Sequence, residues 1–124
     1  MLVPLDGSPE AETSIEPALK IDRPLDCPLE LVTVRDPVYG RWERELDDVA
    51  DALAYDQVEV TLVGAGWPGD VIVEMASEQP GTLVCMAARH RDQFDRLVLG
   101  SVSAHVVRNN PEPVLLVGPN YRTG

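Results

Sequence analysis

The sequence predicts an α/β fold in which a parallel sheet carries helices on both faces, with residues 1–124 forming one domain. Short apolar runs alternate with amphipathic segments, and such alternation implies right-handed crossovers between parallel strands. Most of the runs are nearly continuous, which is typical of strands covered on both faces. The five runs span residues 2–5, 29–34, 58–63, 82–86 and 114–117.

The first helix is predicted to begin directly after the first strand. Ser8 can cap it, and Pro9 suits its first position. We expect Pro17 to kink this helix, because the proline ring removes one backbone hydrogen bond. Its apolar face comprises Ala11, Ile15, Ala18 and Leu19.

The second helix follows the strand at residues 29–34. Trp42, Leu46, Val49 and Leu53 recur at helical spacing and share one face. We interpret Trp42 as a core anchor, with a ligand platform as the alternative. The next run, 58–63, places Glu59 and Thr61 on one side, and this alternation indicates an exposed edge strand.

Two further helices complete the pattern. Pro68 opens the third helix, and Pro80-Gly81 ends it. The fourth helix runs from about Ser101 until Asn109-Asn110-Pro111 stops it. Apolar residues of these helices are Val71, Ile72 and Met75 in the third, and Val102, Val106 and Val107 in the fourth.

The chain is strongly acidic. Its 21 acidic and 10 basic residues give a formal net charge of -11, which repels nucleic acid and anionic lipid surfaces. We therefore expect neither as a partner. An acidic surface suited to a salt-rich cytoplasm is one interpretation, and ordinary acidic composition is the other. A melting temperature that does not change with KCl would contradict the first.

The chain opens without a charged and apolar leader pattern, and its apolar runs are far shorter than the roughly 18 residues of a membrane span. We therefore expect a cytoplasmic protein without a membrane segment. Cys27 and Cys85 do not form a disulfide framework, and we expect a reduced intracellular thiol pair.

One stretch carries a specific motif. Met86-Ala87-Ala88-Arg89-His90 is followed, after nine residues, by Gly100-Ser101-Val102. The stretch resembles the ATP-binding signature of the universal stress protein family, Gly-x-x-Gly, nine residues and Gly-Ser, with Ala87 and His90 in the early glycine positions. The resemblance extends from residues 3–8 to 113–117 and includes Gly66-Trp67-Pro68 before the third helix.

This resemblance implies the strand order 3-2-1-4-5, in a Rossmann-like fold of the adenine nucleotide alpha hydrolase type. It implies that Asp6 holds the adenine or ribose and that the Val34 backbone reads the adenine edge. The phosphates would lie at the loop after Met86, near Arg89, Gly100, Ser101 and Val102. Considered alone, Asp6 to Pro9 also suits a turn with a helix cap, and residues 89–91 suit a solvated surface loop.

The two ends of this loop differ. Glycines at its start would permit positive φ angles and close approach to phosphate, whereas Ala87 and His90 carry side chains there. Gly100-Ser101 opens a helix, where free N–H groups favour an anion, although the same pair also serves as an ordinary cap.

Other site chemistries are not indicated. Gly64-x-Gly66-x-x-Gly69 imitates a dinucleotide fingerprint, but no acidic residue follows at the required distance. His90 and His105 lack metal-ligand spacing, and no nucleophile, base and orienter are recognisable, so we expect no metal site and no catalysis.

Two functional hypotheses follow. In the first, the chain is a non-catalytic stress-response protein that acts through protein interaction and pairs as a homodimer through its last strand, 113–117, which would lie at an edge. In the second, it binds an adenine nucleotide such as ATP or AMP through Gly100-Ser101-Val102.

Overall fold

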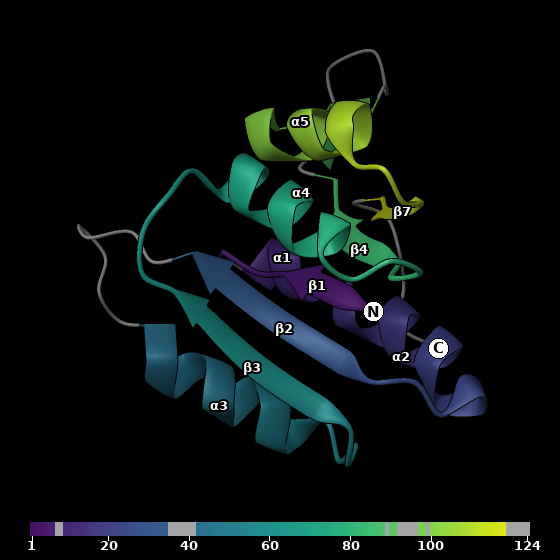
Figure 1. Ribbon diagram of the computed structural model, residues 1–124. Coiled ribbons are helices and arrows are strands. Elements are labelled where there is room, and N and C mark those ends of the chain that lie inside the picture. Colours follow the sequence, from purple (N-terminus) through teal and green to yellow (C-terminus); the bar gives the residue numbers. More distant parts are fainter. Residues whose placement is uncertain (7–8, 35–41, 89, 92–96, 99, 119–124) are drawn as a thin grey trace.

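The computed structural model describes residues 1–6, 9–34, 42–88, 90–91, 97–98 and 100–118; for 9–10, 42–45, 90–91 and 97–98 it describes the backbone alone. Five parallel strands form the central sheet in the order β3-β2-β1-β4-β7 (Figure 1), which confirms the predicted order 3-2-1-4-5. The strands are β1 (Leu2–Pro4), β2 (Leu29–Val34), β3 (Val58–Val63), β4 (Val84–Ala87) and β7 (Val114–Val117).

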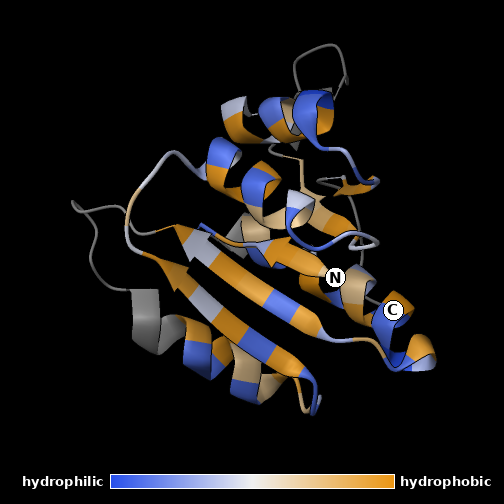
Figure 2. Cartoon of the chain, viewed as in Figure 1, coloured by the Kyte–Doolittle hydropathy of each residue, from blue (hydrophilic) through white to orange (hydrophobic). Residues whose placement is uncertain are grey.

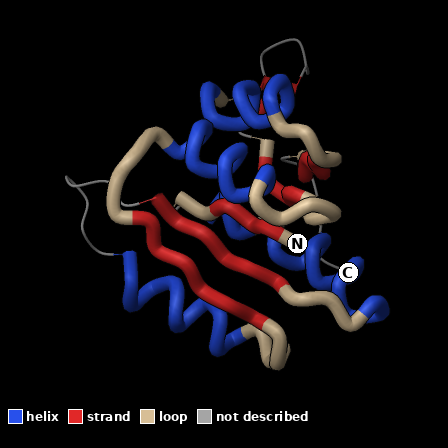
Figure 3. Tube along the Cα trace, viewed as in Figure 1, coloured by secondary structure: helices blue, strands red, loops and turns tan. Residues whose placement is uncertain are grey.

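Helices cover both faces of this sheet (Figure 3). One layer holds α1 (Pro9–Glu12), α2 (Ile15–Leu25) and α3 (Trp42–Ala52), and the other holds α4 (Pro68–Ser77) and α5 (Ser101–Asn109). Two apolar clusters fill the space between sheet and helices. Val3 and Leu31 belong to the α2 and α3 side, whereas Leu2 and Val32 belong to the α4 and α5 side. Adjacent strand residues point to opposite faces, so the near-continuous apolar runs supply both cores.

The first helix is divided, not merely kinked. α1 ends at Glu12, and α2 begins at Ile15. Pro17 has no N–H to donate to the carbonyl four residues before it, at Thr13, and the division falls at that point. Ser14 is fully buried in the gap, and its Oγ donates to the Ala11 carbonyl at 2.8 Å. The Ser8 cap lies outside the described residues.

The remaining helices follow their predicted faces. Leu46 is buried, and Val49 and Leu53 pack beside it, while the side chain of Trp42 lies outside the described residues. α4 starts at Pro68 and buries Ile72, but it ends at Ser77, before the predicted Pro80-Gly81 stop. α5 has the predicted bounds; Val106 is fully buried and Val107 is 44% exposed.

The sheet is asymmetric at its edges. β3 is an edge strand, as its alternation predicted, and β7 is the opposite edge. Figure 2 shows hydrophilic positions in β2 and β3. Glu30 of β2 and Glu59 of β3 are register partners on one face of the sheet.

None of the helices in the described part of the chain has the length and apolar character that crossing a membrane requires.

Candidate functional site

The predicted site lies at the carboxyl edge of the sheet, where the winding reverses between β1 and β4. Asp6 follows β1 and is exposed, and the Leu5 N–H before it donates to the Val32 carbonyl at 2.7 Å. Val34 ends β2 and is partly buried. The structure therefore brings Asp6 and the end of β2 to the same edge.

The loop after Met86 does not open as a glycine-type turn. Met86 is buried, and β4 continues through Ala87, which pairs with Val117. The Ala88 N–H donates to the Val117 carbonyl at 2.8 Å, and Ala88 is only 2% exposed. The start of this loop is thus an extension of the sheet.

His90 also has strand geometry. It begins β5 (His90–Arg91), which pairs antiparallel with β6 (Leu97–Val98), where the sequence had suggested a surface loop. Among the described residues other than glycine, only Asp26 and Ala54 have positive φ. Ala87 and His90 therefore lack the conformation that glycine at these positions would permit. Arg89, expected near the phosphates, lies outside the described residues.

The end of the loop is a helix N-terminus. Gly100 is the N-cap residue of α5, with φ of -68° and ψ of 169°, and its carbonyl accepts the Ala104 N–H at 2.9 Å. Its cap position has no side-chain hydrogen bond. Ser101 is exposed, whereas Val102 packs against the core between sheet and helices. The first-turn N–H groups of a helix have no intrahelical partner, and the predicted anion site at Gly100-Ser101 lies at such a helix start.

Ser103 connects the two ends of the loop. Its side chain is buried, and its Oγ donates to the Ala87 carbonyl at 3.5 Å. The sequence analysis did not single out this residue. Its position three residues before Val106 places both on the buried face of α5, and that spacing was the available signal.

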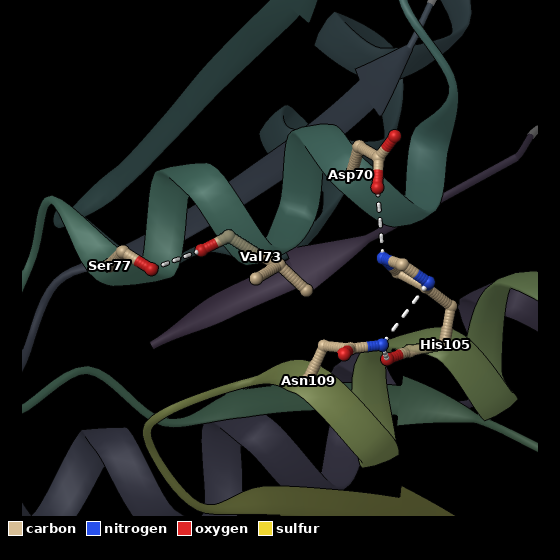
Figure 4. A network of polar contacts seen from close by, with 5 residues as sticks. All are labelled: Asp70, Val73, Ser77, His105 and Asn109. Carbon is tan, nitrogen blue, oxygen red and sulfur yellow. Dashed lines mark hydrogen bonds and ion pairs between the residues drawn. The ribbon is translucent and has the colours of Figure 1, made fainter.

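A polar cluster that the sequence did not predict joins α4 to α5 (Figure 4). His105 Nε2 lies 2.9 Å from Asp70 Oδ1, and its Nδ1 lies 3.3 Å from Asn109 Nδ2. The rings of His105 and Trp67 meet edge to face, with 4.6 Å between centroids. The Nε2 contact with Asp70 links α5 to α4, whereas the Nδ1 contact with Asn109 lies within α5 and orients the ring.

Two of the three glycines that resemble a dinucleotide fingerprint, Gly66 and Gly69, lie at or beside this junction. Gly66 has φ of +112°, a conformation that glycine adopts without strain. Gly69 is buried in α4, and a Cβ there would lie 2.6 Å from the Trp67 ring and 3.0 Å from His105. The spacing therefore produces a turn and a close helix–helix contact.

Nowhere in the described residues do three or more His, Cys, Asp or Glu side chains gather as metal ligands would. Cys85 is buried in β4, and its Sγ donates to the Ser14 carbonyl at 3.4 Å. Burial, with a smaller contribution from the charge of Asp22, raises the pKa of the Cys85 thiol to about 12. A thiol with that pKa stays protonated at neutral pH and is a poor nucleophile.

Comparisons with known proteins agree with this architecture. A sequence model of the universal stress protein family matches residues 1–118. A universal stress protein of Methanocaldococcus jannaschii is 27% identical over 136 residues, which cover 94% of this chain and 80% of that protein. A universal stress protein solved in complex with cAMP is 27% identical, with a TM-score of 0.73 and coverage of 96% and 95%. Another, from Archaeoglobus fulgidus, is 25% identical, with a TM-score of 0.67 and coverage of 93% and 95%. The chain belongs to the universal stress protein family.

Proposed function

We propose that this chain is a non-catalytic, cytoplasmic stress-response protein that acts by associating with other protein chains. The observation that carries the proposal is the extended backbone at Ala87 and His90, which lie in β4 and β5. An anion nest needs consecutive N–H groups turned toward the ligand, whereas the Ala88 N–H donates to Val117. The start of the loop is therefore engaged in sheet pairing.

The decisive experiment is a nucleotide titration followed by thermal unfolding. A ligand at 100 times its dissociation constant stabilises the native state by about 2.7 kcal/mol. We expect millimolar ATP, ADP or AMP, with and without Mg²⁺, to leave the melting temperature of the parent unchanged. A clear upward shift would reject the proposal in favour of a nucleotide-binding function.

Association is proposed to produce a homodimer through β7. Val84 and Ala88 donate to the carbonyls of Pro113 and Val117, so the backbone groups of Val114 and Leu116 point away from β4. Unpaired backbone N–H and C=O groups at a sheet edge can hydrogen-bond to a strand of another chain. Sedimentation should show a dimer that Leu116→Pro dissociates, because this proline removes an outward donor. A monomeric parent would contradict the dimer.

A second candidate function is adenine-nucleotide binding, favoured by the exposed N-terminus of α5. In this alternative, Asp6 and Val34 contact the base and ribose, and Met86, Arg89, Gly100, Ser101 and Val102 form the phosphate end. The similar protein solved with cAMP makes a nucleotide the ligand class to test. Calorimetric titration with ATP, AMP and cAMP at high salt would detect it directly.

A further inference from the structure

The outer edge of β3 presents a regular row of backbone groups. β3 pairs with β2 in unbroken register over all six residues, and the Leu29 N–H donates to the Gln57 carbonyl at 2.8 Å. In a parallel ladder, alternate residues face the neighbouring strand. Glu59 and Thr61 therefore bond toward β2, whereas Val58, Val60 and Leu62 turn their N–H and C=O groups outward. No third strand of the described part of the chain pairs with them.

This edge lacks the protection found at the opposite edge. β7 has four residues and is preceded directly by Pro113, which limits pairing. β3 has six residues and contains no proline. Its register with β2 contains no bulge. A proline, a bulge and a short length, three features that block strand addition, are thus absent from β3, and the exposed charge of Glu59 remains to select the partner.

The surroundings of the row are acidic. Glu59 is exposed on the face that also carries Glu30, and Glu30 accepts hydrogen bonds from Thr61 at 2.6 Å and Gln79 at 3.2 Å. α3 packs along β3 (Figure 1). The exposed acids on this helix are Asp47, Asp48 and Asp51. None of the side chains described on α3 and β3 is basic.

Arg23, a basic residue near the amino end of β3, already interacts with the turn before that strand. Arg23 donates to the Leu53 carbonyl at 2.8 Å, and its guanidinium lies 5.8 Å from the centre of the Tyr55 ring. It therefore stabilises the turn before β3, and among the described residues no ion pair joins Glu59 to a basic side chain.

We propose that the outer edge of β3 binds an extended, basic polypeptide segment by strand addition. The outward groups of Val58, Val60 and Leu62 pair with the backbone of the segment. Its alternate lysine or arginine side chains lie beside Glu59, on the sheet face opposite α3. Main-chain bonds supply affinity in this mode, and alternate side chains supply specificity. The site is separate from β7, so it does not depend on the proposed dimer.

The same charges disfavour a second copy of this chain as the occupant. Two β3 strands paired at this edge would bring Glu59 and the acids of α3 near their own counterparts. Like charges across a strand pair are destabilising. A basic segment is instead attracted to these acidic side chains. Salt weakens that attraction, because the charged groups are exposed.

The test uses the full chain and a short synthetic peptide in which lysine and valine alternate, with both ends blocked. Calorimetry at low salt should show binding, and a matched peptide with glutamate in place of lysine should show none. Amide hydrogen exchange supplies the location. The peptide should slow exchange of Val58, Val60 and Leu62 about tenfold or more, while Glu59 and Thr61, already paired with β2, change little.

Two variants separate charge from backbone pairing. Glu59→Lys should weaken binding of the lysine peptide about fivefold, whereas Glu12→Lys, the same charge change at an exposed residue of α1, should not. Val60→Pro should abolish strand addition, because it removes an outward donor without removing a bond to β2. The Glu59 result stands even if the proline variant fails to fold.

Three results would overturn the proposal. One is absence of binding by the lysine peptide at low salt. Another is equal binding of the two peptides, or uniform protection without the alternation along β3. The third is concentration-dependent self-association that protects the same three amides, which would assign the edge to a second copy.

Discussion

The two ends of the loop between β4 and α5 are held in different ways. At its start, Ala87 and Ala88 are bound to β7 through backbone pairing, and His90 pairs with β6. At its end, Gly100 and Ser101 open a helix that is fixed by side chains, through Val106 in the core and His105 against α4.

This difference bears on the two predicted ends of the phosphate site. Backbone N–H groups that pair in a sheet are unavailable to a ligand, whereas the first N–H groups of a helix have no intrahelical partner. Side chains in place of glycine thus affect the start of the loop, while the end depends on how firmly α5 is held.

The largest expected effect concerns the anchor of α5. Val106 is fully buried, so Val106→Ala should lower the free energy of unfolding by about 2 kcal/mol. Val107, 44% exposed on the same helix, is the matched control, and Val107→Ala should cost less than about 0.5 kcal/mol. Urea denaturation measures both. Equal losses would mean that α5 does not hold the end of the loop through this face.

A second experiment alters the start of the loop. The double variant Ala87→Gly with His90→Gly should lose about 1–2 kcal/mol, because glycine in a strand costs roughly 0.5–1 kcal/mol per residue. It should also bind ATP, which the parent is expected not to do. Denaturation and calorimetry read the two effects separately. If the variant loses stability and gains no binding, the early glycines alone do not create a phosphate site.

A third prediction concerns Asp22, a buried carboxyl group in α2. Asp22 is 2% exposed, and Oδ2 has no hydrogen-bond partner among the described residues. Burial raises the pKa of Asp22, partly offset by the charge of the Met1 amino group. The native state therefore binds a proton more tightly than the unfolded chain does, and this stabilisation is lost as pH rises through the folded-state pKa.

Asp22→Asn removes that dependence. The variant should be more stable than the parent near neutral pH, by about 1 kcal/mol, and the difference should shrink as the pH falls. Thermal unfolding in neutral and mildly acidic buffers measures it. A variant less stable than the parent at neutral pH would show that the carboxylate is satisfied in the folded protein.

Gly69→Ala is expected to change stability less than the three preceding changes. The added Cβ must displace the Trp67 ring. Because that ring is partly exposed and can move, the free energy of unfolding should fall by less than about 1 kcal/mol. Trp67 fluorescence, measured in a Trp42→Phe background, should shift to longer wavelength. Gly64→Ala, whose Cβ meets nothing within 4 Å, should leave the spectrum unchanged. An unchanged Gly69→Ala spectrum would contradict the packing of Trp67 at the α4–α5 junction.

Much of the fold followed from local patterns. The bounds of β2, β3 and β7 match their apolar runs, and the alternation of Glu59 and Thr61 identified β3 as an edge. The site was predicted less completely, because His105 comes from α5 whereas Asp70 and Trp67 come from the start of α4. Their contact depends on how α4 and α5 pack, and no residue spacing encodes it.

The sequence by itself determined the α/β class, the alternating elements and, through the motif ending in Gly100-Ser101-Val102, the family. Apolar periodicity and capping residues act over a few positions, so they are readable along the chain. Only the tertiary structure decided that Ala87 and His90 lie in strands, since their partners, Val117 and Val98, are distant or unmarked in the sequence. The backbone conformation at the start of the predicted phosphate loop is thus a property of its sheet pairing.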